Sequence, residues 1–139
     1  MADWTRRVCI VLSWYLGAGT IASAWAVEPE TAVRSAVPAT RAGVEFFEKR
    51  IRPVLAAECY VCHSAQARKL RGRLRLDTPA GIMAGGASGP VVVPGNVEES
   101  LLISALRHDG LEMPPQKKLP ESVIADFAHW VRLGAPLPA

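Results

Sequence analysis

Apolar side chains recur at steps of three and four residues in several stretches of the chain, the spacing that gathers them on one face of a helix. The first such stretch predicts a helix from about Gly43 to Ala57. Its inner face consists of Val44, Phe47, Ile51, Val54 and Leu55. Pro53 lies inside this stretch, and because proline has no backbone donor we expect a kink, or a break with a short final turn that leads to Cys59.

Two further helices are predicted nearer the C-terminus. Asn96 with Glu99 three residues later has the form of a capping pair, which predicts a helix that runs to about Arg107. Its apolar face consists of Leu101, Leu102, Ala105 and Leu106. The last helix is predicted from Pro120 to Gly134. Its inner face consists of Ile124, Phe127, Ala128 and Val131.

The segments between these helices are dense in glycine and proline. One short helix is predicted to open at Pro79, capped by Asp77 or Thr78, and to end at Gly85-Gly86. The remaining segments predict loops with one extended run, Val91 to Val93. The side chains expected to point inward from the basic loop are Leu70, Leu74 and Leu76. No sheet is expected, so the predicted fold class is all-α, with short helices and long Gly/Pro-rich loops that surround a bound group.

The first 26 residues have the form of an export signal. Arg6 and Arg7 precede an apolar run from Val8 to Ala22, and Ala24-Trp25-Ala26 resembles a cleavage site. We therefore expect a signal peptide over residues 1–26 and a working part in the periplasm, at the cell surface or secreted. The alternative is an uncleaved N-terminal membrane anchor, since the run approaches spanning length.

The rest of the chain is expected to hold one domain. Residues 27–42 combine Pro, Ala, Thr, Ser and Glu without an apolar period, which predicts a flexible leader or tether, and residues 43–139 form the domain. The net charge of +3 is too small to indicate nucleic-acid binding. Aromatic residues make up 6% of the 139 residues, and 11 glycines and 11 prolines leave few side chains for a core. Such a chain often needs a metal, disulfides or a cofactor for stability.

The segment ECYVCHSAQ, residues 58–66, indicates which of these the chain uses. Cys59, Cys62 and His63 have the C-x-x-C-H form of c-type haem attachment, in which the cysteines bind the porphyrin and the histidine is the proximal iron ligand. Attachment takes place after export, in agreement with the predicted signal peptide. We therefore predict one covalently bound haem c.

Other uses of the two cysteines are weaker. A zinc site needs four ligands, and the only further histidines are His108 and His129, without a second cysteine pair. A thioredoxin-like dithiol needs a preceding strand, which the sequence does not predict. A disulfide between Cys59 and Cys62 closes too small a loop to stabilise much.

Met113 is predicted to be the second axial ligand of the haem iron. It lies in the segment LEMPP, where Pro114 favours an extended backbone at Met113 and stiffens the loop. The alternatives are that Met113 packs in the core, or that Met83 or His108 takes the position. His129 is interpreted as a structural or surface residue.

Two loops are open to more than one interpretation. Five cations, Arg68, Lys69, Arg71, Arg73 and Arg75, follow the haem motif. They either steer an acidic redox partner, neutralise the haem propionates, or form a solvated face. The segment GGASGP, residues 85–90, either lends backbone donors to a propionate or forms a simple turn.

From Phe46 to Pro136 the chain resembles the planctomycete-type cytochrome c domain, a relative of the class I cytochromes. The matching pieces, in order, are FFEKRIRPVLAAECYVCHS, GRLRLDT, GGASGPVVVPG, ESLLISALRH, MPPQKKLP and HWVRLGAP. The resemblance implies a class I-like fold whose first and last helices pack together over the haem, with Phe47 and Trp130 near their contact. It also implies haem on Cys59 and Cys62, with His63 proximal and Met113 distal. Such domains usually open a longer secreted chain, so a free-standing carrier and a shortened gene product are both expectations.

The predicted function is that of an exported monohaem c-type cytochrome, which carries one electron by cycling Fe(III)/Fe(II) and is not an enzyme. The expected partner is another redox protein, with no nucleic acid, and with membrane contact only through an uncleaved anchor. The alternatives are a haem sensor, an interaction or anchoring module associated with a larger secreted enzyme, and a peroxidase-like site. The sensor and peroxidase readings require an open position on the iron.

Overall fold

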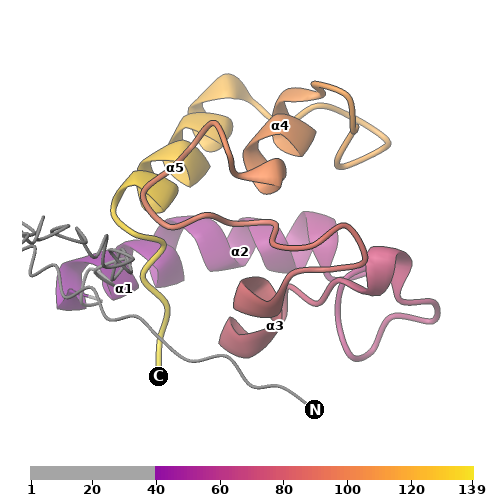
Figure 1. Cartoon of the computed structure of the whole chain (residues 1–139), viewed down its shortest axis with the longest axis horizontal. Helices are drawn as coiled ribbons and strands as arrows, with labels where there is room; N and C mark the ends of the chain where they lie inside the picture. Colours follow the sequence, from indigo (N-terminus) through magenta and orange to yellow (C-terminus); the bar gives the residue numbers. More distant parts are fainter. Residues whose placement is uncertain (1–39) are drawn as a thin grey trace, which may run out of the picture. The chain divides into compact units, whose positions relative to one another are not determined.

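The computed structural model describes residues 40–139; the predicted signal peptide and most of the predicted leader lie outside the described residues. The described part contains the α-helices α1 (Arg41–Phe46), α2 (Arg52–Val54), α3 (Pro79–Ala84), α4 (Leu101–Arg107) and α5 (Glu121–Arg132), the π-helical segments η1 (Phe47–Ile51) and η2 (Leu55–Cys59), and the short 3₁₀ turn η3 (Arg71–Arg73). Within it there is no strand, only isolated bridges in two turns. The all-α prediction is confirmed (Figure 1).

The first helical run is longer and more continuous than predicted. It begins at Arg41 because the hydroxyl of Thr40 accepts a hydrogen bond from the N–H of Gly43 at 3.1 Å, and it continues through η1, α2 and η2 to Cys59. Of the two outcomes expected at Pro53, a kink or a break, the break does not occur. Pro53 lies in the first turn of α2, where no backbone donor is needed, and the wider π-helical turns on both sides take up the irregularity.

Local capping residues set the start of α3 but not the start of α4. α3 opens at Pro79 as predicted, since the Thr78 hydroxyl accepts a hydrogen bond from the N–H of Gly81. α4 starts at Leu101, later than the Asn96–Glu99 pair predicted. The Asn96 side chain does accept a hydrogen bond from the N–H of Glu99, but this bond closes a separate turn.

The start of α4 is set by contacts with the preceding loop. The buried Ser100 hydroxyl donates to the carbonyl of Asn96 at 2.6 Å and accepts from the N–H of Val93 at 2.9 Å. The N–H of Leu102 donates to the carbonyl of Val91 at 2.8 Å. An N–H group in the first turn of α4, that of Leu102, therefore finds its partner in the loop, which fixes the helix against the Val91–Val93 run.

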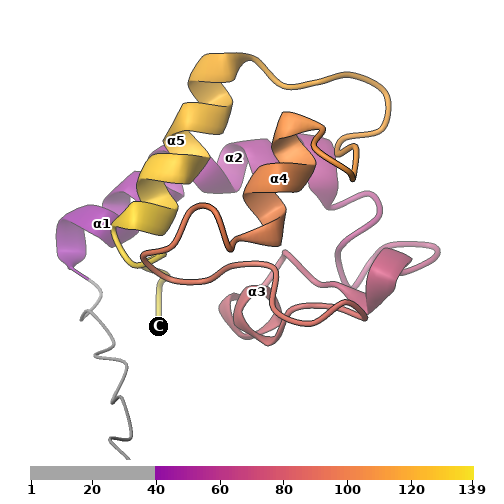
Figure 2. The same ribbon diagram turned by 45° about the horizontal axis from the view of Figure 1, so that its top comes forward.

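α5 packs against the first helical run, as the two views of the ribbon show (Figures 1 and 2). The predicted inner face of α5 is confirmed, with Ile124, Phe127, Ala128 and Val131 all buried. The rings of Phe47 and Trp130 lie with centroids 5.5 Å apart at this contact, as the resemblance implied. Within residues 40–139, none of the helices combines the length and the apolar character needed to cross a lipid bilayer.

Trp130 also fixes the C-terminal segment, which gives a prediction for stability. Its indole Nε1 donates to the carbonyl of Pro136 at 2.9 Å, and the side chain is fully buried. We expect Trp130→Phe to lower the free energy of unfolding by about 1–3 kcal/mol, because the buried carbonyl loses its donor. Chemical denaturation of the haem-loaded protein measures this. Arg132→Ala, on the exposed side of the same helix, is the control and is expected to stay within ~0.5 kcal/mol of wild type.

Candidate cofactor site

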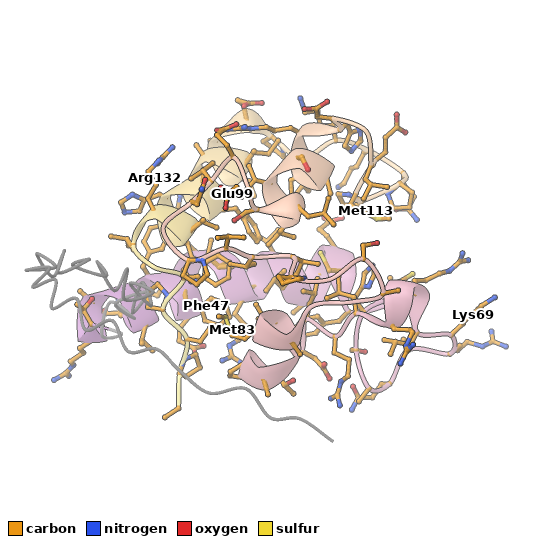
Figure 3. All side chains as sticks on the ribbon, in the orientation of Figure 1. Phe47, Lys69, Met83, Glu99, Met113 and Arg132 are labelled. Carbon is orange, nitrogen blue, oxygen red and sulfur yellow. The ribbon has the colours of Figure 1, made fainter. Side chains whose placement is uncertain are left out.

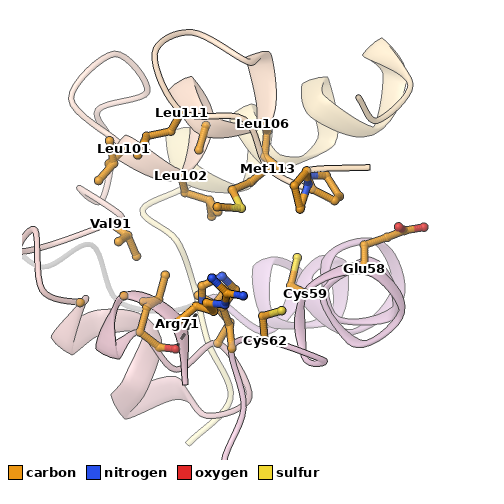
Figure 4. Close-up of a pocket in the computed structure, with 18 of the residues that line it drawn as sticks. Glu58, Cys59, Cys62, Arg71, Val91, Leu101, Leu102, Leu106, Leu111 and Met113 are labelled. Atoms are coloured by element: carbon orange, nitrogen blue, oxygen red, sulfur yellow. Dashed lines mark hydrogen bonds between the residues drawn. The ribbon is translucent and has the colours of Figure 1, made fainter. Parts of the chain in front are cut away.

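A cavity of about 620 Å³ opens between the end of the first helical run and α4, a size typical of cofactor pockets (Figure 4). Its walls are mainly apolar. The aliphatic side chains that form them include Leu74, Leu76, Val91, Leu101, Leu102 and Leu106. All of these except Val91, which was predicted only as part of an extended run, belong to the predicted inward-facing sets, so the cavity is a preformed apolar site inside the fold.

Both cysteines of the motif face this cavity. Cys59 ends η2, and a tight turn follows, in which the N–H groups of Cys62 and His63 both donate to the carbonyl of Cys59, at 3.1 and 2.9 Å. This turn carries Cys62 and His63 to the same cavity wall as Cys59. Cys59 is buried, Cys62 is half-buried, and both are free thiols, so each sulfur is available for bonding to a group in the cavity (Figure 4).

The His63 ring is oriented by the chain that follows it. Its Nδ1 lies 3.4 Å from the carbonyl oxygen of Leu74, and its own carbonyl accepts a hydrogen bond from the N–H of Leu76 at 2.8 Å. A carbonyl can only accept, so Nδ1 carries the proton in this long hydrogen bond. The lone pair then resides on Nε2, the arrangement in which a neutral imidazole can bind a metal.

Met113 lines the same cavity from the other side (Figure 4). Its backbone N–H donates to the carbonyl of Ala105 in α4 at 3.0 Å, and its peptide bond to the buried Pro114 is cis. The Met113 side chain is 37% exposed, which is too much for ordinary core packing. The sulfur-bearing side chain is thus presented at the cavity rather than buried among other side chains.

The two competing residues, Met83 and His108, and the third histidine, His129, lie elsewhere in the described part of the chain. Met83 is 45% exposed on α3 and does not line the cavity (Figure 3). His108 caps the C-terminus of α4 in the left-handed conformation, also outside the cavity lining. His129 is exposed on α5 and packs edge-on against Phe46, with ring centroids 5.0 Å apart. Of these candidates, the cavity therefore brings only Met113 together with His63.

Zinc and dithiol chemistry find no support in this geometry. Among residues 40–139, no group of three or more His, Cys, Asp or Glu side chains is placed to hold a metal ion. Burial raises the pKa of the Cys59 thiol to about 11, so Cys59 is not a reactive thiolate at neutral pH. No strand precedes Cys59 in the described structure, whereas a thioredoxin-like site requires one.

The five cations of the basic stretch separate into different environments. Arg75 forms an ion pair with Asp77 at 3.1 Å, and this guanidinium, together with the N–H of Ala65, holds the pKa of the Asp77 carboxyl below its ordinary value. Arg71 lines the cavity and has no ion pair within residues 40–139. The other three, Arg68, Lys69 and Arg73, are exposed, do not line the cavity and lack ion pairs in the same range. Arg71 is therefore the cation available to a group in the cavity.

The glycine-rich loop offers fewer donors than its sequence suggested. Gly86, Ala87 and Ser88 line the cavity, but the N–H groups of Gly86 and Ala87 already donate to the carbonyls of Gly89 and Gly72, at 2.9 and 2.7 Å. Ser88 is thus the member of this loop that faces the cavity with a hydroxyl and no backbone bond in the described structure. The Ala87–Gly72 bond joins this loop to the turn that carries Arg71, which makes one end of the cavity polar.

Other features of the site were not predicted or differ from prediction. The Leu74 carbonyl that orients His63 carries no signal in the sequence, because every residue has a carbonyl. Glu58 lines the cavity, and only its position beside Cys59 could have indicated it. Leu70 was expected to point inward but is 39% exposed. The N–H of Arg71 donates to the carbonyl of Cys62 and closes a loop of the residues between them, with Leu70 on its outer side.

Comparison with known proteins supports the interpretation of this cavity. Residues 59–117 match the family described as Planctomycete cytochrome C, which confirms the predicted resemblance. The matched segment contains Cys59, Cys62, His63 and Met113, the four residues that the fold gathers around the cavity. No curated protein and no solved structure matches the chain. A family of cytochromes c implies haem c as the bound group, and the residues similar to it make up less than half of the 139-residue chain.

Proposed function

We propose that the domain, which matches planctomycete cytochrome c over residues 59–117, is an exported monohaem electron carrier. In this proposal Cys59 and Cys62 hold one haem covalently, and His63 and Met113 are its axial ligands. The observation that carries the proposal is that one apolar cavity is lined by all four of these residues. The domain then needs no catalytic residues of its own, because its task is to hold a redox group.

The chemistry of the cavity lining fits a haem. Its walls are apolar, as a porphyrin ring requires, and it has a polar end at Arg71 and Ser88 that suits the two propionates. When bound, haem c supplies a one-electron Fe(III)/Fe(II) couple. The sulfurs of Cys59 and Cys62 would hold it through thioether bonds, so that the cofactor stays in place through repeated electron transfer.

The protein's own groups set the conditions for this couple. The hydrogen bond from Nδ1 of His63 to the Leu74 carbonyl fixes the ring and increases the electron-donating strength of Nε2. A thioether ligand from Met113 raises the reduction potential compared with a second nitrogen ligand. The aliphatic walls exclude water from the site, which lowers the reorganisation that accompanies a change in charge.

Arg71 is the residue proposed to bind the haem propionates, and this gives a second prediction. We expect Arg71→Met to lower the reduction potential, because loss of a nearby positive charge favours the Fe(III) state. The charge is worth on the order of 1 kcal/mol at the dielectric of a protein surface, or roughly 40 mV. Loss of the guanidinium also raises the pKa of the propionates, so the pH at which the potential changes moves upward.

Redox titration of haem-loaded protein across a range of pH measures both effects. Arg68→Met is the matched control, since Arg68 is an exposed cation of the same basic stretch that does not line the cavity. Equal shifts in the two variants would contradict the assignment, because they would indicate a general effect of surface charge.

The proposed partner is another redox protein with an acidic surface. The exposed side chains of Arg68, Lys69 and Arg73 make no ion pairs within residues 40–139, so their charges are available to steer an approaching acidic surface. The predicted export signal supports an encounter between the domain and this partner outside the cytoplasm. The rate of electron transfer is expected to fall as salt concentration rises, since salt screens this attraction.

A haem-based sensor of small ligands is the second candidate, and one observation favours it. Within the described residues, one backbone hydrogen bond, from the Met113 N–H to the Ala105 carbonyl, joins residues 111–119 to another element, so movement of this loop would give an external ligand access to the iron. Carbon monoxide separates the two functions. An electron carrier whose Met113 stays bound shows a reversible one-electron titration and no binding of carbon monoxide by the reduced protein. Stoichiometric binding of carbon monoxide would favour the sensor.

A further inference from the structure

The loop that carries Met113 has few polar attachments to the rest of the domain. The N–H of Met113 donates to the Ala105 carbonyl, and no other backbone hydrogen bond joins residues 111–119 to another element within the described residues. Pro114 and Leu119 are buried and anchor the loop by packing. The segment between these two anchors is exposed, so its position depends on the contacts of its side chains.

One ion pair links this segment to the opposite wall of the cavity. Lys117 Nζ lies 3.4 Å from Glu58 Oε1. Glu58 directly precedes Cys59 in η2 and itself lines the cavity (Figure 4). Lys117 follows Met113 in the same loop. The pair therefore joins the wall that carries the first haem cysteine to the loop that carries the proposed distal ligand.

The surroundings of Glu58 explain why its carboxylate is stabilised by a nearby lysine. The Glu58 side chain is 29% exposed beside an apolar cavity, where an isolated carboxylate loses hydration. Lys117, at 65% exposure, supplies the compensating charge from the solvent side. The neighbouring Lys118 lies 3.9 Å from Glu121 at the start of α5, a contact that does not cross the cavity. The two adjacent lysines thus have different partners and offer a matched comparison.

We propose that Glu58 and Lys117 are positioning residues, whose ion pair straps the Met113 loop across the cavity and opposes displacement of Met113 from the iron. The inference rests on the proposed function, because it concerns the distal ligand of that same site. The pair does not touch the iron; it acts by holding the loop. Its effect is screened by salt, since both side chains are partly exposed.

Displacement of Met113 by imidazole in the oxidised, haem-loaded protein tests the strap. Imidazole binding is measured as the loss of the charge-transfer band of the Met sulfur–Fe(III) bond. We expect Glu58→Gln and Lys117→Met each to raise the apparent affinity for imidazole roughly two- to five-fold, the range that corresponds to measured surface ion pairs. The double variant is expected to show no more than the effect of one change, and Lys118→Met none.

The exchange of charges, Glu58→Lys with Lys117→Glu, is expected to restore most of the wild-type affinity, and high salt to remove the difference between wild type and Lys117→Met. Unchanged affinity in both single variants, with the band intact, would overturn the strap and leave the proposed function standing. Additive effects in the double variant would also overturn it, because the two residues would then act separately. Absence of the band in wild type would overturn both.

Discussion

Replacing Cys59 and Cys62 together by alanine is expected to abolish retention of haem by the denatured chain. In the proposed site these two sulfurs form the only covalent links to the cofactor, and axial bonds from His63 and Met113 do not survive denaturation. Each single replacement leaves one thioether bond, so haem is expected to stay attached, at a lower yield. Absorption of the protein after extraction in acid and organic solvent, which removes non-covalently bound haem, measures retention.

The third cysteine supplies the control for this experiment. Cys9 lies in the predicted signal peptide, outside the described residues, and Cys9→Ala is expected to leave haem retention unchanged. The double variant is also expected to accumulate poorly, because the 620 Å³ cavity then lacks the group that fills it. Haem that remained with the denatured double variant would contradict the assignment of the two thiols.

Replacing Met113 by alanine is expected to remove the Met–Fe(III) charge-transfer band and open the sixth position. The reduction potential is expected to fall by on the order of 0.1 V, part of the ~0.8 V range over which axial ligands set haem potentials. The reduced variant is expected to bind carbon monoxide, because no protein ligand then blocks the iron. Haem itself should be retained, since Cys59, Cys62 and His63 are untouched.

Met83→Ala is the matched control for this prediction. Met83 is another partly exposed methionine of the described structure, but it lies on α3 outside the cavity lining, so the band and the potential are expected to stay as in wild type. Loss of the band in Met83→Ala, with retention in Met113→Ala, would reverse the assignment. Retention of the band in both variants would exclude both methionines as the ligand.

Local sequence signals predicted the elements whose ends are fixed by nearby residues. α3 starts where Thr78 and Pro79 predict, because an N-cap hydroxyl acts within a single turn. The inner face of α5 follows from its apolar period, since one stripe of the helix must meet the core. The turn after Cys59 carries Cys62 and His63 to one wall, so three of the candidate site residues could be placed together from spacing alone.

Contacts between distant segments could not be predicted in the same way. α4 begins at Leu101 rather than after Asn96, because the Val91 carbonyl and the Ser100 hydroxyl set its first turn. Pro53 was expected to kink or break the first helix, but the helical run continues through it, with π-helical turns on both sides. For α4, a hydrogen bond to a separate loop decided the outcome. For Pro53, the altered hydrogen-bond pattern of the helix itself did.

The same limit applies to the polar groups of the site. The basic stretch gave five equivalent cations in sequence, whereas the fold turns Arg71 to the cavity and commits Arg75 to Asp77. The approach of Lys117 to Glu58 joins residues that are far apart in the chain, and no spacing rule indicates it. The tertiary structure thus determines which residue of a charged or polar stretch faces the site.

The central claim is that one haem is held covalently in the cavity, with His63 and Met113 on its iron. The most direct test is the absorption of protein exported from cells that have haem-maturation machinery, recorded oxidised and reduced, before and after denaturing extraction. The account predicts that haem stays with the denatured chain and that the native oxidised protein shows the Met sulfur–Fe(III) charge-transfer band. Complete loss of haem on extraction would contradict the claim.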